Sequence, residues 1–201
     1  MLPDQAGQQD NGIRLGYGEA VTDMKGPIIL TGFMATGKTK IGRLLAGLLG
    51  WSFMDTDAMV VERAGKSISE VFSADGEAAF RGLEHACVLE ACGVADSVVA
   101  LGGGAILEEG NRKAIGASGG ILVCLQADVD TIVERVSRKD NRPLLAGLSR
   151  EQKRAKIELM LAERAPYYAA AAVTFRTSEN RNASVAARRL MIQLESHECT
   201  A

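Results

Sequence analysis

Histidine and cysteine are scarce in this chain of 201 residues, and neither is arranged as metal ligands are. The two histidines, His85 and His197, have no cluster of ligands near them, and the four cysteines contain no CxxC pair. Structural zinc sites need closely spaced cysteine and histidine ligands, so we expect no zinc site. We expect the cysteines to be free thiols in a reducing compartment.

Long apolar runs and an excess of one charge are also missing. No run approaches the roughly 20 apolar residues that cross a bilayer. Asp4 and Asp10 stand where a secretion signal would need a basic and then an apolar region. The formal net charge is -2, which gives no electrostatic reason to expect a nucleic-acid or membrane partner. These absences predict a cytoplasmic protein that binds neither nucleic acid nor membrane.

Short apolar runs alternate with amphipathic stretches once the first 25 residues are passed. Residues 1–25 are polar and rich in glycine, and are predicted to be a disordered tail. Buried strands are predicted at 27–31, 53–54, 98–101, 120–125 and 173–175. Helices are predicted after the first strand up to Gly50, and at 58–64, 67–73, 77–92, 128–138, 150–164 and 183–195. This alternation predicts one α/β domain over 26–201, a three-layer α/β/α structure with a central, mostly five-stranded parallel sheet.

The segment from Gly32 to Thr39 matches the phosphate-binding pattern G-x-x-x-x-G-K-[ST]. Glycines let successive backbone N–H groups turn towards phosphate oxygens, Lys38 adds a point charge, and Thr39 offers a hydroxyl to Mg²⁺. An apolar run precedes the pattern and a helical stretch follows it, which argues against a chance match. The guanine-selecting run N-K-x-D is missing, which weakens a GTPase interpretation. The loop therefore predicts binding of a nucleoside triphosphate with Mg²⁺, and transfer of its terminal phosphate to a small molecule.

Three further groups of residues could form the acceptor side. Asp55 and Asp57 follow the second strand, where one carboxylate could hold Mg²⁺ through water and the other could face a substrate hydroxyl. Arg81 has the planar fork that suits a carboxylate, and Glu84 is placed to hold it. Glycines at 102–104 follow the third strand, at the sheet edge where ligands bind in such folds. The alternatives are a solvated surface for the aspartates, an ordinary helix ion pair for Arg81, and a tight turn for the glycines.

Taken together, the runs GFMATGKT, FMDTD, EAAFRGLE, LGGGA and RPLL resemble those of shikimate kinases, in the same order across residues 26–195. The resemblance implies a P-loop kinase fold with a mobile lid at about 138–148. It implies transfer of the γ-phosphate of ATP to the 3-hydroxyl of shikimate, in the pathway to chorismate. It also leads us to expect a monomer.

The resemblance assigns roles to individual residues. The catalytic residues are Lys38, Asp57 and Arg142. ATP is assigned to Gly32, Ala35, Thr36, Gly37, Lys38, Thr39, Lys40, Arg135, Arg142 and Arg181. Shikimate is assigned to Asp57, Arg81, Gly102, Gly103, Gly104 and Arg164, and Mg²⁺ to Thr39 and Asp55. In one departure, Ala35 replaces the family's usual glycine, which would cost about 1 kcal/mol or more if positive φ is needed there. We expect the loop to tolerate it.

Two other functions stay open. One is a P-loop kinase for a different carboxylated polyol, such as gluconate, although gluconate kinases are not expected to combine EAAFRGLE with RPLL. A nucleotide kinase is less favoured, because no base-binding region can be identified. The other is a non-catalytic ATP-binding module, which would not need all of Lys38, Asp55, Asp57 and Arg142.

Overall fold

The computed structural model describes residues 26–138, 145, 147–178 and 182–198. The predicted tail, Arg142 with most of the predicted lid, and Arg181 lie outside the described residues. No helix in the described ranges is long and apolar enough to cross a membrane.

Five parallel strands form one sheet, as predicted. They are β1 (Ile28–Thr31), β2 (Ser52–Asp55), β3 (Ser97–Ala100), β4 (Ile121–Gln126) and β5 (Val173–Arg176), in the spatial order β2-β3-β1-β4-β5. Every residue of β1 and β3 is buried, which explains their short, uninterrupted apolar runs. The central position of β1 places the phosphate loop that follows it at the middle of the sheet's carboxyl edge.

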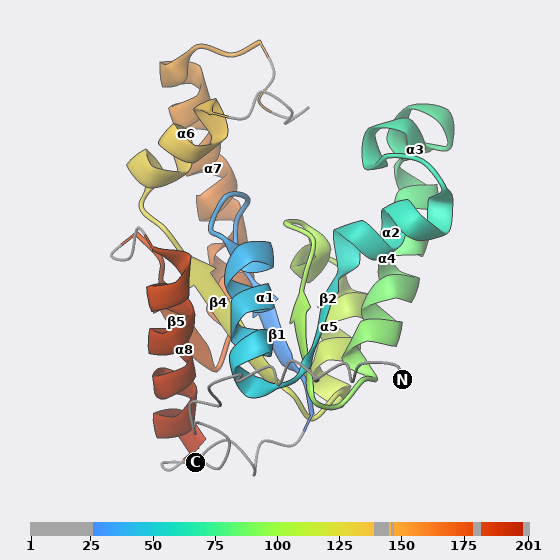
Figure 1. Ribbon diagram of the computed structural model, residues 1–201. Helices are drawn as coiled ribbons and strands as arrows, with labels where there is room; N and C mark the ends of the chain where they lie inside the picture. The colour runs from blue at the N-terminus through green and yellow to red at the C-terminus, as the bar shows by residue number, and fades with distance from the viewer. Residues whose placement is uncertain (1–25, 139–144, 146, 179–181, 199–201) are drawn as a thin grey trace, which may run out of the picture.

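Helices cover both faces of the sheet and complete three layers (Figure 1). One face packs against α1 (Lys38–Leu49) and α8 (Ala183–Glu198). The other packs against α4 (Gly76–Cys92), α5 (Glu109–Ala117) and α7 (Arg150–Tyr168). Alternation along β1 divides the core, because Ile28 and Leu30 join the first apolar cluster while Ile29 joins the second.

Two smaller helical layers rise beyond the carboxyl ends of the strands, on opposite sides of the phosphate loop (Figure 1). On one side, α2 (Thr56–Ala64) and α3 (Ile68–Ala74) pack on α4 around Val60, Val71, Phe80 and Cys87. On the other side, α6 (Val129–Ser137) packs on α7. The candidate site lies between α2, α3 and α4 on one side and α7 on the other.

The helix α5 and the short 3-10 helix η1 (Ala105–Leu107) that precedes it are not predicted by the sequence pattern. The α5 segment is mostly polar, so its apolar periodicity is weak. It is held by Asn111, a fully buried side chain that donates to the Ala105 carbonyl and bonds the His85 ring. The predicted end of α7 was also early, since the helix continues past Pro166 to Tyr168.

Candidate active site

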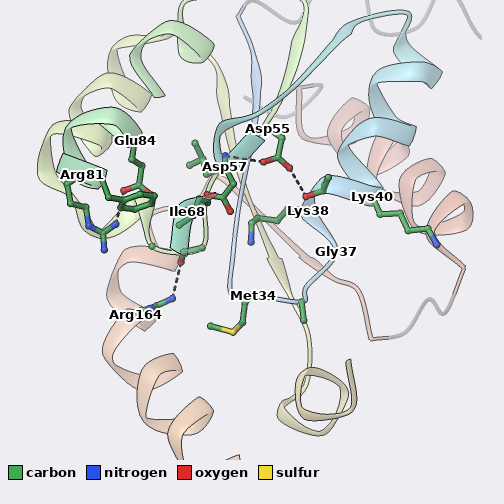
Figure 2. A pocket seen from close by; sticks show the side chains of 16 residues that line it. Met34, Gly37, Lys38, Lys40, Asp55, Asp57, Ile68, Arg81, Glu84 and Arg164 are labelled. Atoms are coloured by element: carbon green, nitrogen blue, oxygen red, sulfur yellow. Dashed lines mark hydrogen bonds and ion pairs between the residues drawn. The ribbon is translucent and has the colours of Figure 1, made fainter. Parts of the chain in front are cut away.

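A cavity of about 440 Å³ opens at the carboxyl edge of the sheet, between the phosphate loop, α2, α4 and α7 (Figure 2). It gathers most of the residues predicted for the site: Ala35, Gly37, Lys38, Thr39, Lys40, Asp55, Asp57, Arg81, Gly103, Gly104 and Arg164. The remaining lining residues are Met34, Ile68, Phe80, Glu84 and Leu101. Of these, only Glu84 had been singled out from the sequence. Segments far apart in the chain thus form one site.

The phosphate loop is held by its own lysine. The Lys38 ammonium donates to the Gly32 carbonyl at 2.8 Å and to the Phe33 carbonyl at 3.1 Å. Gly32 has φ 134°, and a Cβ there would lie 2.2 Å from the Leu125 carbonyl oxygen. Glycine is therefore required at position 32 by close contact with β4. At the other end of the loop, Gly37 has φ 101° and α1 begins directly after it, so the helix N-terminus faces the space where an anion would bind.

Ala35 adopts the positive φ that had been identified as a possible weakness of the loop. Its φ is 61°, in the left-handed region where a Cβ is unfavourable. Arg135 donates to the Ala35 carbonyl at 2.9 Å and to the Thr177 hydroxyl at 3.4 Å. This contact helps to hold a backbone conformation that alanine would not choose by itself.

We predict that Ala35→Gly raises the free energy of unfolding by about 0.5–1 kcal/mol, because the relief of strain exceeds the extra entropy of the unfolded chain. Denaturant titration of the two proteins measures the difference. Asp96→Gly is a matched control: Asp96 also has positive φ, 49°, but aspartate tolerates this region better. An equal gain in both variants, or a loss in Ala35→Gly, would contradict the assignment of strain to Ala35.

Thr39 and Asp55 form a pair of oxygen donors beside the loop. The Thr39 hydroxyl donates to Asp55 Oδ2 at 2.7 Å, while Asp55 Oδ1 accepts from the backbone N–H groups of Asp57 and Ala58. Asp55 is thus fixed as the N-cap of α2. Hard oxygen donors fit Mg²⁺, which often takes only one or two protein ligands besides phosphate and water. Among the described residues no group of three acidic, histidine or cysteine side chains could hold a metal by itself.

Arg81 is anchored by a buried carboxylate. Its Nη1 lies 2.7 Å from Glu84 Oε2, and its Nη2 lies 3.3 Å from Glu77 Oε1. Glu84 is only 2% exposed, and this burial raises its pKa, against the opposing effect of Arg81. The nearby Asp57 charge raises the pKa of Glu84 further. The ion pair that the sequence suggested is therefore present, in a desolvated setting that fixes the guanidinium.

Gly102 makes room for two carboxylates. A Cβ at this position would lie 2.5 Å from Asp57 Oδ1 and 3.0 Å from Glu84 Oε1. Its backbone N–H donates to the buried Thr56 hydroxyl at 2.8 Å. Gly102 does not line the cavity, so the structure gives it a role in packing the residues that do.

Because we expect Asp57 to act in catalysis, Gly102→Ala should lower kcat by about 10- to 100-fold by displacing its carboxylate. Steady-state kinetics would measure the effect. The control is Gly82→Ala on α4, where a Cβ meets nothing within 4 Å and alanine favours the helix. Normal turnover of Gly102→Ala would show that Asp57 does not need its observed position.

Arg164 reaches the cavity from α7. Its Nη1 donates to the Gly103 carbonyl at 2.9 Å, which Figure 2 marks with a dashed line. The sequence predicted Arg81 and Arg164 at one site, and both line this cavity from different helices. Asp57 and Lys38 also line it, so it holds cationic groups and a carboxylate together.

Three other predicted residues, Gly32, Thr36 and Arg135, are not among the residues that line the cavity. Gly32 packs on β4 as described. Thr36 is buried, and its hydroxyl donates to the Phe33 carbonyl at 2.8 Å. Arg135 donates to the carbonyl of Ala35 in the loop. These positions support the loop in this structure.

The cysteines in the described ranges are buried free thiols, as expected. They are Cys87, Cys92 and Cys124. Burial raises the pKa of Cys92 and Cys124 to about 11. Both thiols are therefore protonated at neutral pH and are poor nucleophiles.

A parallel sheet in this order, with the phosphate loop between β1 and α1 and a cavity beyond the carboxyl edge, defines the protein as a P-loop kinase of the small α/β type. The family model for shikimate kinase matches residues 34–195. The chain belongs to the shikimate kinase family, which confirms the resemblance seen in its sequence motifs.

Individual relatives agree with this assignment. A shikimate kinase from Moorella thermoacetica is 44% identical over 163 residues, which cover 81% of this chain and 91% of that protein. The solved shikimate kinase from Bacteroides thetaiotaomicron superposes with a TM-score of 0.79 at 32% identity, over 85% of this chain and 99% of that one. A shikimate kinase from Acinetobacter baumannii, solved in complex with shikimate, gives a TM-score of 0.77 at 35% identity, over 85% and 93% of the two chains.

Proposed function

We propose that this protein transfers the γ-phosphate of ATP to the 3-hydroxyl of shikimate, giving shikimate 3-phosphate and ADP. The observation that carries the proposal is the cavity itself, which combines the phosphate-loop lysine, the Asp57 carboxylate and two arginines at one edge of the sheet. Shikimate has a hydroxyl to be phosphorylated and one carboxylate to be paired. The relative from Acinetobacter baumannii was solved with this compound.

On the donor side, the loop amides and Lys38 would bind the phosphates of ATP. Lys38 would exchange its two carbonyl contacts for phosphate oxygens, which form stronger, charge-assisted bonds. Thr39 and Asp55 would hold Mg²⁺, which neutralises phosphate charge when it is bound. Arg142 is proposed to close over the phosphates, with Lys40, Arg135 and Arg181 contributing to the ATP site.

On the acceptor side, Asp57 would orient the attacking hydroxyl and accept its proton. Arg81 and Arg164 would bind the carboxylate, and both guanidinium groups are already held, by Glu84 and by the Gly103 carbonyl. This pairing offsets the repulsion between the anionic acceptor and ATP. Phosphoryl transfer needs chiefly such alignment and charge stabilisation. We further propose that the enzyme acts as a monomer in the cytoplasm.

A panel assay with the purified full chain tests the proposal. ADP release would be coupled to a spectroscopic readout with ATP, Mg²⁺ and, separately, shikimate, gluconate and nucleoside monophosphates. Of these acceptors, we expect only shikimate to be phosphorylated. Turnover with gluconate instead would favour a different carboxylated polyol as acceptor. ATP binding without any product would favour the non-catalytic module.

A further inference from the structure

Phe33, in the phosphate loop, contacts the groups on both sides of the cavity. Its carbonyl accepts from Lys38 at 3.1 Å and from the Thr36 hydroxyl at 2.8 Å. Its ring lies beneath the Arg164 guanidinium, with 5.3 Å between Arg164 Cζ and the ring centroid. One loop residue thus joins the proposed ATP site to the proposed carboxylate site.

The two arginines of the cavity are held in different ways. Arg81 lies among three carboxylates, those of Glu77, Glu84 and Glu108. Arg164 forms no ion pair in the described part of the chain. Its guanidinium contacts the Gly103 carbonyl and the Phe33 ring. It also interacts with the Tyr168 hydroxyl, where burial raises the pKa and the Arg164 charge opposes that rise. The charge of Arg164 is therefore not neutralised by the protein. Its position depends on a few polar contacts and on the face of an aromatic ring, which attracts cations.

Phe33 provides a rigid support for this contact. The side chain is 1% exposed and packs in an apolar cluster that includes Ile132, Val133 and Ile157. Its carbonyl would keep the Thr36 hydroxyl bond even when Lys38 turns to a phosphate. The backbone of Phe33 is thus held by the Thr36 hydroxyl, and its ring is held by the apolar cluster. Neither contact depends on what the loop binds.

We propose that Phe33 is a positioning residue for Arg164, and that its ring sets the place of the guanidinium that receives the acceptor's carboxylate. The inference rests on the role proposed above for Arg164. It gives the phosphate loop a second task, which is to order the acceptor end of the cavity. The property that matters is the electron-rich ring face, which an aliphatic side chain of similar size does not have.

Phe33→Leu should raise KM for shikimate by about threefold to tenfold, which corresponds to the usual strength of a partly buried cation–π contact. KM for ATP should stay within about twofold. Ile132→Val is the matched control, since Ile132 is buried in the same apolar cluster. It should lower Tm without changing KM for shikimate. An equal rise in both KM values for Phe33→Leu would indicate loop damage and would overturn the inference.

A second variant separates the ring's charge distribution from its shape. Trifluorophenylalanine at position 33 keeps nearly the same volume but weakens the negative face of the ring. We expect KM for shikimate to rise in this variant with Tm unchanged. Unchanged KM would overturn the inference even if Phe33→Leu fails to fold.

A double-mutant cycle shows whether Phe33 acts through Arg164. Arg164→Met should raise KM for shikimate strongly, and adding Phe33→Leu should then have an effect of less than about twofold. Full additivity of the two changes would overturn the positioning role while leaving the proposed function intact. No effect of Arg164→Met would instead contradict the role of Arg164 in the proposed function.

Discussion

Lys38→Ala should lower kcat by about 1,000-fold or more, since a fixed positive charge at the transferring group stabilises the charge that develops in the transition state. The ammonium is the group that the structure places at the phosphate loop, bonded to two loop carbonyls. Steady-state kinetics with shikimate and ATP would give kcat, and calorimetry would give the affinity for ATP. We expect this large fall in kcat to come with little change in the free energy of unfolding.

The control for this experiment is Lys113→Ala, which removes the same charge on the surface. Lys113 forms an exposed ion pair with Glu109 on α5, far along the chain from the loop. It should leave kcat unchanged, because exposed pairs contribute little. Near-normal turnover in Lys38→Ala would remove the claim that the loop supports phosphoryl transfer.

Asp57→Asn should lower kcat by about 100- to 10,000-fold, the usual contribution of a positioned general base. Asparagine keeps the shape that fits beside Gly102, so the change isolates the charge. The affinity for ATP should be unchanged, because Asp55 and Thr39 stay in place. The pKa of Glu84 should also fall, since the Asp57 charge raises it in the native protein.

The same kinetic assay measures this variant, with NMR titration of Glu84 as an independent check. If Asp57→Asn turned over at a rate close to that of the native enzyme, the hydroxyl would have to be oriented by another group. A fall in the Glu84 pKa together with normal turnover would show that the substitution took effect but that Asp57 is not the base.

The sheet and the phosphate loop could be predicted because their signals are local. Fully buried parallel strands leave uninterrupted apolar runs, and the loop pattern spans only eight residues, Gly32 to Thr39. The helix α5 could not be predicted in this way, since buried Asn111 is stabilised by partners on other segments. Apolar periodicity indicates which apolar side chains are buried, and it does not reveal a buried polar side chain whose hydrogen bonds are made within the protein.

The cavity lining was predicted only where a motif carried it. Ile68 lines the cavity from α3 because of how this helix packs, and that packing leaves no pattern around it. Phe80 lies in the run EAAFRGLE, but nothing in the run shows that its ring lines the cavity. Gly102 was predicted from the resemblance to contact substrate; the structure adds that a side chain at this position would meet Asp57 and Glu84. A glycine run in a sequence shows that space is needed, and the structure identifies what fills it.

The two cavity arginines differ in their ion pairing, so the acceptor end of the cavity should select acceptors by their net charge. Arg81 already lies among Glu77, Glu84 and Glu108, whereas Arg164 has no ion pair in the described part of the chain, so the Arg164 charge is the one left for the acceptor to balance. A monoanion balances it. A neutral analogue with an amide in place of the carboxylate leaves the guanidinium unmatched, and a dianion brings one charge too many against Asp57 and ATP. Selection between acceptors of similar shape would therefore follow their ionisation state, and discrimination should weaken at high ionic strength.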